Sequence, residues 1–186
     1  MEILLATMDD FDGILALLKA NHADNLTPEE KKEGFVTTNF TREQMETLIV
    51  QEKGVVIAKE NGRVVGFATA APWDFWAQWP LFTYMIDHLE EYTFQGTTLS
   101  VENCYQYGPV CVDRAFRGTG LFQKLFYASL ESMAHRFPIM ATFINQVNPR
   151  SYRAHTKKVP MDTCGTFPFN GNQYYLMACS TSLRPE

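Results

Sequence analysis

The sequence predicts an α/β fold in which helices flank a central mixed β-sheet. Three observations lead to this prediction. Short β-rich runs alternate with amphipathic helical segments along the chain. The dipeptide Asn61-Gly62 joins two of those runs as a hairpin, which places an antiparallel pair in the sheet. No repeat, low-complexity tract or linker divides the chain, so we expect a single domain over residues 1–186.

The first part of the chain predicts a strand, two helices and then the hairpin. Both helices are expected to begin at a capping box, in which a Thr and a residue three positions later satisfy each other's backbone N–H groups. Residues 25–40, between the helices, are polar and broken by Pro28 and Gly34, so we expect a loop or an irregular helix there. The expected elements are a strand at 3–5, helices that start after 7–10 and after 41–44, and strands at 55–59 and 63–71.

The remaining elements follow an aromatic-rich insertion at about residues 72–100, which we expect to be partly helical. Asn148-Pro149 predicts the start of the last helix, because Asn is a preferred N-cap and Pro a preferred first helical residue. Pro160 marks its end. The other expected elements are a strand at 107–113, a helix at 120–135, a strand at 139–145 and a closing hairpin at 164–180.

Composition narrows the class of protein. The chain is 46% hydrophobic, which suits a full core, and its net charge of -5 argues against a general nucleic-acid binder. No apolar run approaches the ~18 residues of a membrane span, and the N-terminus lacks a basic signal-peptide region. We therefore expect a cytoplasmic protein with no membrane partner. The four cysteines form no CxxC pair and have no His at ligand spacing, so we expect reduced thiols and no metal.

The chemically informative segment spans residues 110–125. An apolar strand runs into Arg117-Gly118-Thr119-Gly120, and an amphipathic helix follows at once. Glycines let the backbone approach a ligand, and the first turn of a helix offers unpaired N–H groups and a partial positive charge. This pattern suits a pyrophosphate, with Arg117 adding a full charge. The alternative is a glycine turn that only connects strand to helix; the sequence has neither a P-loop nor a complete dinucleotide fingerprint.

The strand, turn and helix resemble the acetyl-CoA-binding motif of the GNAT superfamily of N-acetyltransferases. That motif reads Arg/Gln-x-x-Gly-x-Gly/Ala, and here Arg117 to Gly120 match it while Phe122 replaces its last small residue. The order of elements also resembles this family over nearly the whole chain. The resemblance implies a single N-acetyltransferase-like domain that binds acetyl-CoA. The implied binding residues in this segment are Val110, Cys111, Val112, Arg117, Gly118, Thr119, Gly120, Leu121 and Phe122.

A second part of the resemblance lies at the last helix. The family has an Asn that opens this helix and often a Tyr general acid seven residues later; here the matching residues are Asn148 and His155. The resemblance implies that Asn148 and Ser151 contact the pantetheine arm of coenzyme A. It also implies that His155 takes the place of the Tyr that protonates the leaving thiolate. The alternative is that His155 only packs in the helix.

The resemblance implies direct attack of a neutral amine on the thioester, so the ionisation of the amine matters. An amine with a pKa of ~10.4 is neutral only about once in 2,500 molecules at pH 7, whereas an α-amine near ~8 is neutral about a tenth of the time. Glu102, just before the central strand, is the candidate base, acting directly or through a water. The alternative for Glu102 is a solvated side chain with no role in the reaction.

The insertion is our candidate for the acceptor side. Trp73, Asp74 and Trp76 could hold an organic cation, because aromatic faces and a carboxylate both attract positive charge. They could equally form the core of an inserted helix or a homodimer contact.

We therefore expect an N-acetyltransferase that acts on an amine of a small molecule or peptide, with acetyl-CoA as co-substrate. Acetyl and longer acyl donors are equally compatible with these motifs. The alternative is a catalytically inactive acyl-CoA-binding sensor or interaction module, and a weaker one is a structural protein whose turn binds nothing.

Overall fold

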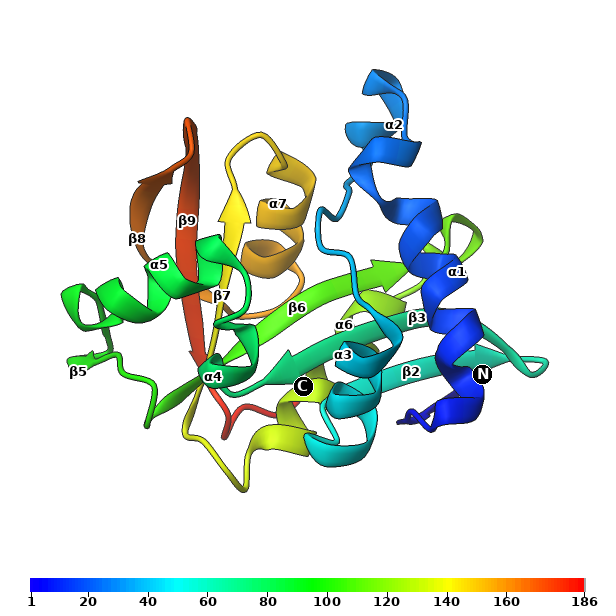
Figure 1. The fold of residues 1–186 in the computed structure, drawn as a ribbon, viewed down its shortest axis with the longest axis horizontal. Helices are drawn as coiled ribbons and strands as arrows, with labels where there is room; N and C mark the ends of the chain where they lie inside the picture. Colours follow the sequence, from blue (N-terminus) through cyan, green and yellow to red (C-terminus); the bar gives the residue numbers. More distant parts are fainter. Residues whose placement is uncertain (186) are drawn as a thin grey trace. The chain divides into compact units, whose positions relative to one another are not determined.

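Helices and strands alternate in the computed structural model of the chain, which describes residues 1–185 (Figure 1). The strands are β1 (Glu2–Leu5), β2 (Val55–Glu60), β3 (Arg63–Ala71), β4 (Thr93–Phe94), β5 (Thr97–Thr98), β6 (Cys104–Val112), β7 (Ile139–Asn145), β8 (Asp162–Phe169) and β9 (Asn172–Ser180). The helices are α1 (Phe11–Asn21), α2 (Pro28–Lys31), α3 (Arg42–Glu46), α4 (Trp73–Trp76), α5 (Pro80–His88), α6 (Leu121–Met133) and α7 (Pro149–Lys157). The predicted order of elements is confirmed, and the insertion adds the short β4-β5 pair.

The strands pair as a mixed sheet, which confirms the predicted α/β fold class. Seven strands hydrogen-bond in the order β1-β2-β3-β6-β7-β9-β8. Strands β6 and β7 run parallel, whereas β1-β2, β2-β3, β7-β9 and β8-β9 are antiparallel. The parallel ladder is short, since it pairs only three residues of β6, Cys104 to Gln106, with residues of β7.

The chain folds into two compact units, and β6 contributes to both. The first unit comprises Met1–Ala70 and Gly108–Ser132, and the second comprises Ala71–Tyr107 and Met133–Glu186. Each unit therefore draws on two separate stretches of sequence. The single domain over residues 1–186 stays a prediction.

In the first unit, helices cover both faces of β3, with α1 on one face and α6 on the other (Figure 1). The register of β2 and β3 shifts beyond Ala58, so that Val65 is an extra residue in β3. This bulge reverses the alternation of side chains, and Val64 and Gly66 face opposite helices. A Cβ at Gly66 would lie 2.8 Å from Leu125 of α6, so the missing side chain lets α6 approach the strand.

In the second unit, the insertion packs its aromatic residues on β7, β9 and β8. Trp76 of α4 stacks on Phe82 of α5, with 4.9 Å between ring centroids. Phe82 in turn contacts Phe143 of β7 at 5.0 Å, and Phe143 meets Phe167 of β8 at 5.9 Å. The aromatic run of the sequence is therefore the core of an inserted helical layer.

The last strand of the sheet, β8, is contacted by Tyr92 from the same insertion. The Tyr92 hydroxyl donates to the Thr166 carbonyl oxygen at 3.3 Å. Its ring occupies the space beside Gly165, where a Cβ would come within 2.7 Å of the ring. A glycine at this position of β8 thus makes room for Tyr92.

Replacing Gly54 by Ala should destabilise the protein strongly. A Cβ there would lie 1.7 Å from the Ala70 carbonyl oxygen, and the Ala70 N–H already bonds to the Gly54 carbonyl oxygen at 2.7 Å. Because the clash is with backbone, we expect a loss of ~3 kcal/mol, or a fall of about 6–12 °C in Tm. Gly96→Asn, at an open turn with φ of 82°, is the matched control and should change Tm little. Equal Tm values for both variants would contradict this account of Gly54.

Candidate functional site

The glycine loop between β6 and α6 has the backbone that the sequence predicts for a phosphate-binding turn. Gly118 and Gly120 have φ values of 81° and 85°, in the region that favours glycine. A Cβ at either glycine would meet no atom within 4 Å, so backbone conformation rather than space requires the glycines. The Thr119 hydroxyl donates to the Phe116 carbonyl oxygen at 2.7 Å and closes the turn.

This loop presents backbone N–H groups rather than using them internally. Within residues 1–185, no hydrogen bond is recorded from the N–H groups of Gly118, Thr119, Gly120 or Leu121. Helix α6 begins at Leu121, so the same N–H groups lie at the positive end of the helix dipole. Gly118 and Thr119 are exposed. The loop therefore has the geometry and the charge of an anion site.

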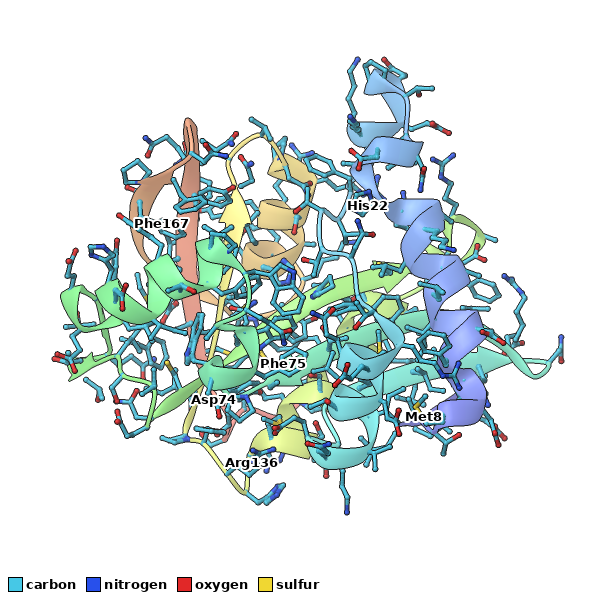
Figure 2. The ribbon with its side chains drawn as sticks, viewed as in Figure 1. Met8, His22, Asp74, Phe75, Arg136 and Phe167 are labelled. Carbon is cyan, nitrogen blue, oxygen red and sulfur yellow. The ribbon has the colours of Figure 1, made fainter. Side chains whose placement is uncertain are left out.

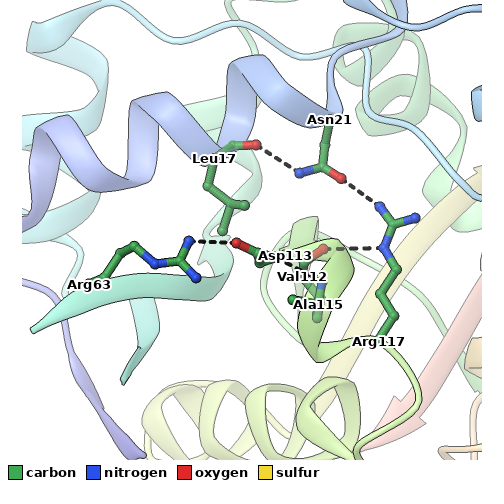
Figure 3. Close-up of polar contacts among 7 residues, drawn as sticks. All are labelled: Leu17, Asn21, Arg63, Val112, Asp113, Ala115 and Arg117. Atoms are coloured by element: carbon green, nitrogen blue, oxygen red, sulfur yellow. Dashed lines mark hydrogen bonds and ion pairs between the residues drawn. The ribbon is translucent and has the colours of Figure 1, made fainter. Parts of the chain in front are cut away.

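The guanidinium of Arg117 holds the loop in place (Figure 3). Its Nη2 donates to the Asn21 side-chain oxygen at 2.7 Å, and its Nη1 to the Glu33 carbonyl oxygen at 3.0 Å. Its Nε donates to the Val112 carbonyl oxygen at 3.3 Å. Asn21 is itself fixed, because its Nδ2 donates to the Leu17 carbonyl oxygen at 2.8 Å. Arg117 thus joins the end of α1, the segment after α2 and the end of β6.

These bonds change what the sequence suggests for Arg117. We expect from the sequence that its side chain adds a full charge beside a bound phosphate. In the structure its three nitrogens donate to groups of the protein, so its side chain positions the loop. Nearby Arg114 pairs with Glu30 at 3.0 Å. The backbone N–H groups of the loop remain as the donors for an anion.

Asp113, directly after β6, fixes the end of this strand through its backbone and its side chain. The Asp113 N–H donates to the Val65 carbonyl oxygen at 2.9 Å, and the Asp113 carboxylate accepts from Arg63 at 2.6 Å and from the Ala115 N–H at 2.9 Å (Figure 3). The hydrogen bond from Arg63 is the main cause that lowers the pKa of Asp113. Of the predicted cofactor residues in this strand, Cys111 is buried and Val110 and Val112 are half-buried.

In the second unit, helix α7 carries the other predicted cofactor residues. The Asn148 side-chain oxygen accepts from the Ser151 N–H at 3.3 Å, which makes Asn148 the N-cap as predicted. One turn on, the Ser151 carbonyl oxygen lies 2.8 Å from Nδ1 of His155. The spacing of Asn148, Ser151 and His155 therefore places all three on the same side of α7.

His155 is buried, with 3% of its surface exposed. A carbonyl oxygen only accepts, so Nδ1 carries the proton and donates to Ser151. Burial lowers the pKa of His155 from 6.5 to about 4. At pH 7 only about one molecule in a thousand carries the imidazolium form. Its ring meets that of Tyr107 edge-on, with 5.9 Å between centroids.

Glu102, the predicted base, lies apart from His155. Its side chain is exposed, in the turn before β6, while Tyr107 at the ring of His155 lies further along the strand. The three residue steps of strand from Cys104 to Tyr107 span about 10 Å. The structure does not bring the two predicted catalytic residues together.

The three predicted acceptor residues are divided between core and surface. Trp73 and Trp76 are buried, and their indole N–H groups donate to the Cys104 sulfur at 3.3 Å and to the Ala71 carbonyl oxygen at 3.2 Å. Asp74 is exposed, whereas its neighbour Phe75 is buried (Figure 2). Burial favours the packing interpretation for the two tryptophans; contact of the three with an acceptor stays a prediction.

Sequence reasoning missed three residues that the structure places at key points. Asn21 fixes Arg117, and the two residues are 96 positions apart, so no local pattern signals their bond. Gln106 and Thr142 both donate to the Tyr107 carbonyl oxygen, at 2.6 and 2.7 Å, where the β6-β7 ladder ends. A lone Gln inside an aromatic strand was the available signal for Gln106.

No group of three or more His, Cys, Asp or Glu side chains among residues 1–185 is placed to hold a metal ion. No helix in that part of the chain has the length and apolar character required to cross a bilayer.

Comparison with known proteins places these features in a family. A family model described as the acetyltransferase (GNAT) family matches residues 16–159. No curated protein matches the chain significantly. Among solved structures, the chain resembles a ribosomal-protein-alanine N-acetyltransferase from Brucella melitensis (TM-score 0.63, 19% identity, covering 97% of this chain and 99% of that one). It also resembles yncA from Salmonella typhimurium, solved with acetyl-CoA (TM-score 0.63, 16% identity, covering 100% of this chain and 96% of that one). A third similar structure is smu.2055 from Streptococcus mutans (TM-score 0.66, 13% identity, covering 98% of this chain and 100% of that one).

The buried His155 should make the protein less stable in acid. Its pKa is about 4 in the folded state and near 6.5 when unfolded, so the unfolded chain binds the proton first as the pH falls. Stability from this group is therefore present above pH 6.5 and lost between pH 6.5 and 4, to a total of about 3 kcal/mol. Denaturant unfolding of wild type and His155→Gln across this range measures it. The exposed His135→Gln is the control; parallel curves for wild type and His155→Gln would refute the assignment.

Proposed function

The chain belongs to the acetyltransferase (GNAT) family, and from this premise we propose that it is an N-acetyltransferase acting on an amine of a small molecule or peptide. Acetyltransferases of this family use acetyl-CoA. The observation that best supports the proposal is the glycine loop before α6, in which Gly118 and Thr119 are exposed and the backbone N–H groups of residues 118–121 donate to no acceptor within residues 1–185. A pyrophosphate is the ligand that such a loop suits.

The residues of the loop fit coenzyme A. In the first unit, the backbone of Gly118, Thr119, Gly120, Leu121 and Phe122 would hold the pyrophosphate, and Arg117 would keep the loop in shape. The half-buried backbone of Val110 and Val112 would contact the pantetheine arm, with Cys111 packed below it. Phe122 is half-buried, so its bulky side chain packs partly on the helix.

In the second unit, Asn148 and Ser151 at the start of α7 are proposed to contact the pantetheine arm. Asn148 is 8% exposed and its side-chain oxygen already caps the helix. The support for this contact is their position, because both residues lie at the first turn of α7.

The proposed reaction conserves atoms and protons. The neutral amine nitrogen attacks the thioester carbonyl carbon, a C–N bond forms and the C–S bond breaks. The nitrogen loses one proton, and the coenzyme A sulfur gains one. A backbone N–H held at the carbonyl oxygen typically contributes ~3 kcal/mol to the transition state of such an acyl transfer.

The two proton transfers constrain the roles of His155 and Glu102. His155 is neutral at pH 7, so as a proton donor to the thiolate it would act only from its small imidazolium fraction. We propose that its Nε2 takes up a proton from solvent and passes it to the thiolate, so that the imidazolium form exists only transiently. Glu102 is exposed, which suits a group that receives, through water, the proton that the amine nitrogen loses after its attack. Both roles remain proposals, as do a homodimer and a cytoplasmic location.

A second candidate function is an acyl-CoA-binding module without catalysis. The burial of His155 and the exposure of Glu102 favour it, because the two predicted proton-transfer residues are not assembled. The loop would then serve binding alone.

Replacing Gly120 by Val should abolish binding of acetyl-CoA. A β-branched residue is strongly disfavoured at a φ of 85°, so the N–H groups of the loop would no longer converge. Wild type at a ligand concentration of 100 Kd should gain ~2.7 kcal/mol, a shift of about 5–11 °C, with acetyl-CoA or coenzyme A and none with NAD. Gly96→Val, with a φ of 82° in a surface turn, is the matched control and should keep the shift. A shift that survives in Gly120→Val would remove the loop from the binding site.

Turnover separates the enzyme from the binding module. Release of free thiol from acetyl-CoA in the presence of amines should be detected for wild type. His155→Phe should lower kcat more than it changes the shift by acetyl-CoA, because the imidazole serves the proton step. Binding without thiol release from any amine would favour the module, and unchanged kcat across the pH range would exclude His155 from the reaction.

A further inference from the structure

Gln106 in β6 has a buried oxygen with no hydrogen-bond donor. The side chain is 3% exposed, and its Oε1 is buried without a partner within residues 1–185. Its Nε2 donates to the Tyr107 carbonyl oxygen at 2.6 Å. Since a carbonyl oxygen only accepts, the amide cannot be flipped, and Oε1 is the atom left over. A buried polar atom without a partner costs ~1–3 kcal/mol, so this atom needs an explanation.

The orphaned oxygen lies where β6 and β7 cease to pair. Gln106 is the last residue of β6 in the ladder, opposite Ala141. The next carbonyl, of Tyr107, accepts from the side chains of Gln106 and Thr142. Two side chains thus satisfy the carbonyl that would continue the ladder, and one of them presents a further oxygen at the same point.

The face of β6 that carries Gln106 is lined by aromatic residues of the second unit. Side chains alternate along a strand, so Gln106 shares its face with Cys104, whose sulfur accepts from Trp73 at 3.3 Å. Across the ladder, Phe143 shares the face of Ala141 and contacts Phe82 at 5.0 Å. Tyr107 lies on the opposite face, against His155. An amide oxygen in such surroundings is a strong hydrogen-bond acceptor.

We propose that Oε1 of Gln106 accepts a hydrogen bond from the N–H of the acceptor amine, and that the enzyme selects amines already neutral near pH 7. This inference rests on the proposed function. Oε1 is buried in the free protein, so the proposal requires that neighbouring side chains move to admit the amine. An amide orients a neutral nitrogen, but it cannot remove a proton from an ammonium group.

The charges around Gln106 support selection of neutral amines. No Asp or Glu of the second unit, as far as the structure describes it, is buried. Among the titratable neighbours in β6, burial raises the pKa of Cys104 to about 11 and that of Tyr105 well above its usual value. Strand β7 offers Ala141 and Phe143 on this face, and α4 offers Trp73. Asp74, next to Trp73, is exposed to solvent, so a charged ammonium at Gln106 would have no buried counterion, which disfavours it.

Wild type alone tests the selection, with two lysine amides that give the same product. One is acetylated on Nε and offers an α-amine, and the other is acetylated on Nα and offers an ε-amine. If the rate follows the neutral fraction of each amine, the kcat/KM ratio should be about 200 in favour of the α-amine at pH 7 and about 20 at pH 9. A ratio below about ten at pH 7 would mean that an enzymic base removes a proton from the ammonium group before attack. A ratio independent of pH would mean that the enzyme selects amines by shape. Either result overturns the proposal.

Variants at Gln106 test the contact itself. Gln106→Met keeps the length of the side chain but loses the amide, and should lower kcat/KM for the α-amine about tenfold or more. Gln106→Glu, with its buried carboxyl protonated, can donate to the Tyr107 carbonyl oxygen and keep one oxygen that accepts, so it should retain more activity on the α-amine than the Met variant. Gln173→Leu, at an exposed position of β9, is the control and should act as wild type. Equal kcat/KM values for Gln106→Met and wild type would overturn the contact.

The thermal shift with acetyl-CoA separates a failure of the proposed function from a failure of the inference about Gln106. A folded Gln106→Met that keeps the shift but loses activity supports the contact with the acceptor. If wild type shows neither a shift nor turnover with any amine, the proposed function has failed. If wild type binds and turns over but its preference ignores the ionisation of the amine, only the inference about Gln106 has failed. The wild-type ratio stays decisive should the Met variant not fold.

Discussion

The hydrogen bonds of one guanidinium set the geometry of the first unit's binding loop. A glycine loop has little conformational preference of its own, so it must be held by something else. Arg117 supplies this by donating to Asn21, Glu33 and Val112, which come from a helix end, a connecting segment and a strand end. Because the side chain is committed to these oxygens, the loop presents its N–H groups instead. The side chain of Arg117 therefore sets the shape of the loop, and in the proposed function the backbone N–H groups contact the ligand.

The order of elements was predictable because it depends on local signals. The capping boxes at Thr7 and Thr41, the Asn61-Gly62 turn and the Asn148 N-cap all act within a few residues, and the structure confirms each. The glycine loop belongs to the same class, since two positive φ values follow from the glycines themselves. The roles of side chains depend on distant neighbours and were less accessible. The partners of Arg117 lie 84 and 96 residues away, and the burial of His155 depends on how α7 meets β6.

Burial also determines which side chains of the second unit can carry a proton at pH 7. On α7 the imidazole of His155 is enclosed, and burial lowers its pKa so that it stays neutral at pH 7. Gln106 is likewise polar but does not titrate. A site built from neutral groups orders its substrate by hydrogen bonds and depends on the substrate for the correct protonation state. This explains how catalysis and the absence of a buried carboxylate in the described second unit are compatible.

The contact of Tyr92 with β8 has a consequence for how copies of the chain can associate. A strand at the border of a sheet exposes a row of backbone groups that can template the addition of a foreign strand. The Tyr92 hydroxyl engages one group of that row, the Thr166 carbonyl oxygen, and its ring covers the face of β8 at Gly165. A foreign strand that paired along β8 would have to displace Tyr92 at this carbonyl, so the insertion disfavours the addition of a strand there.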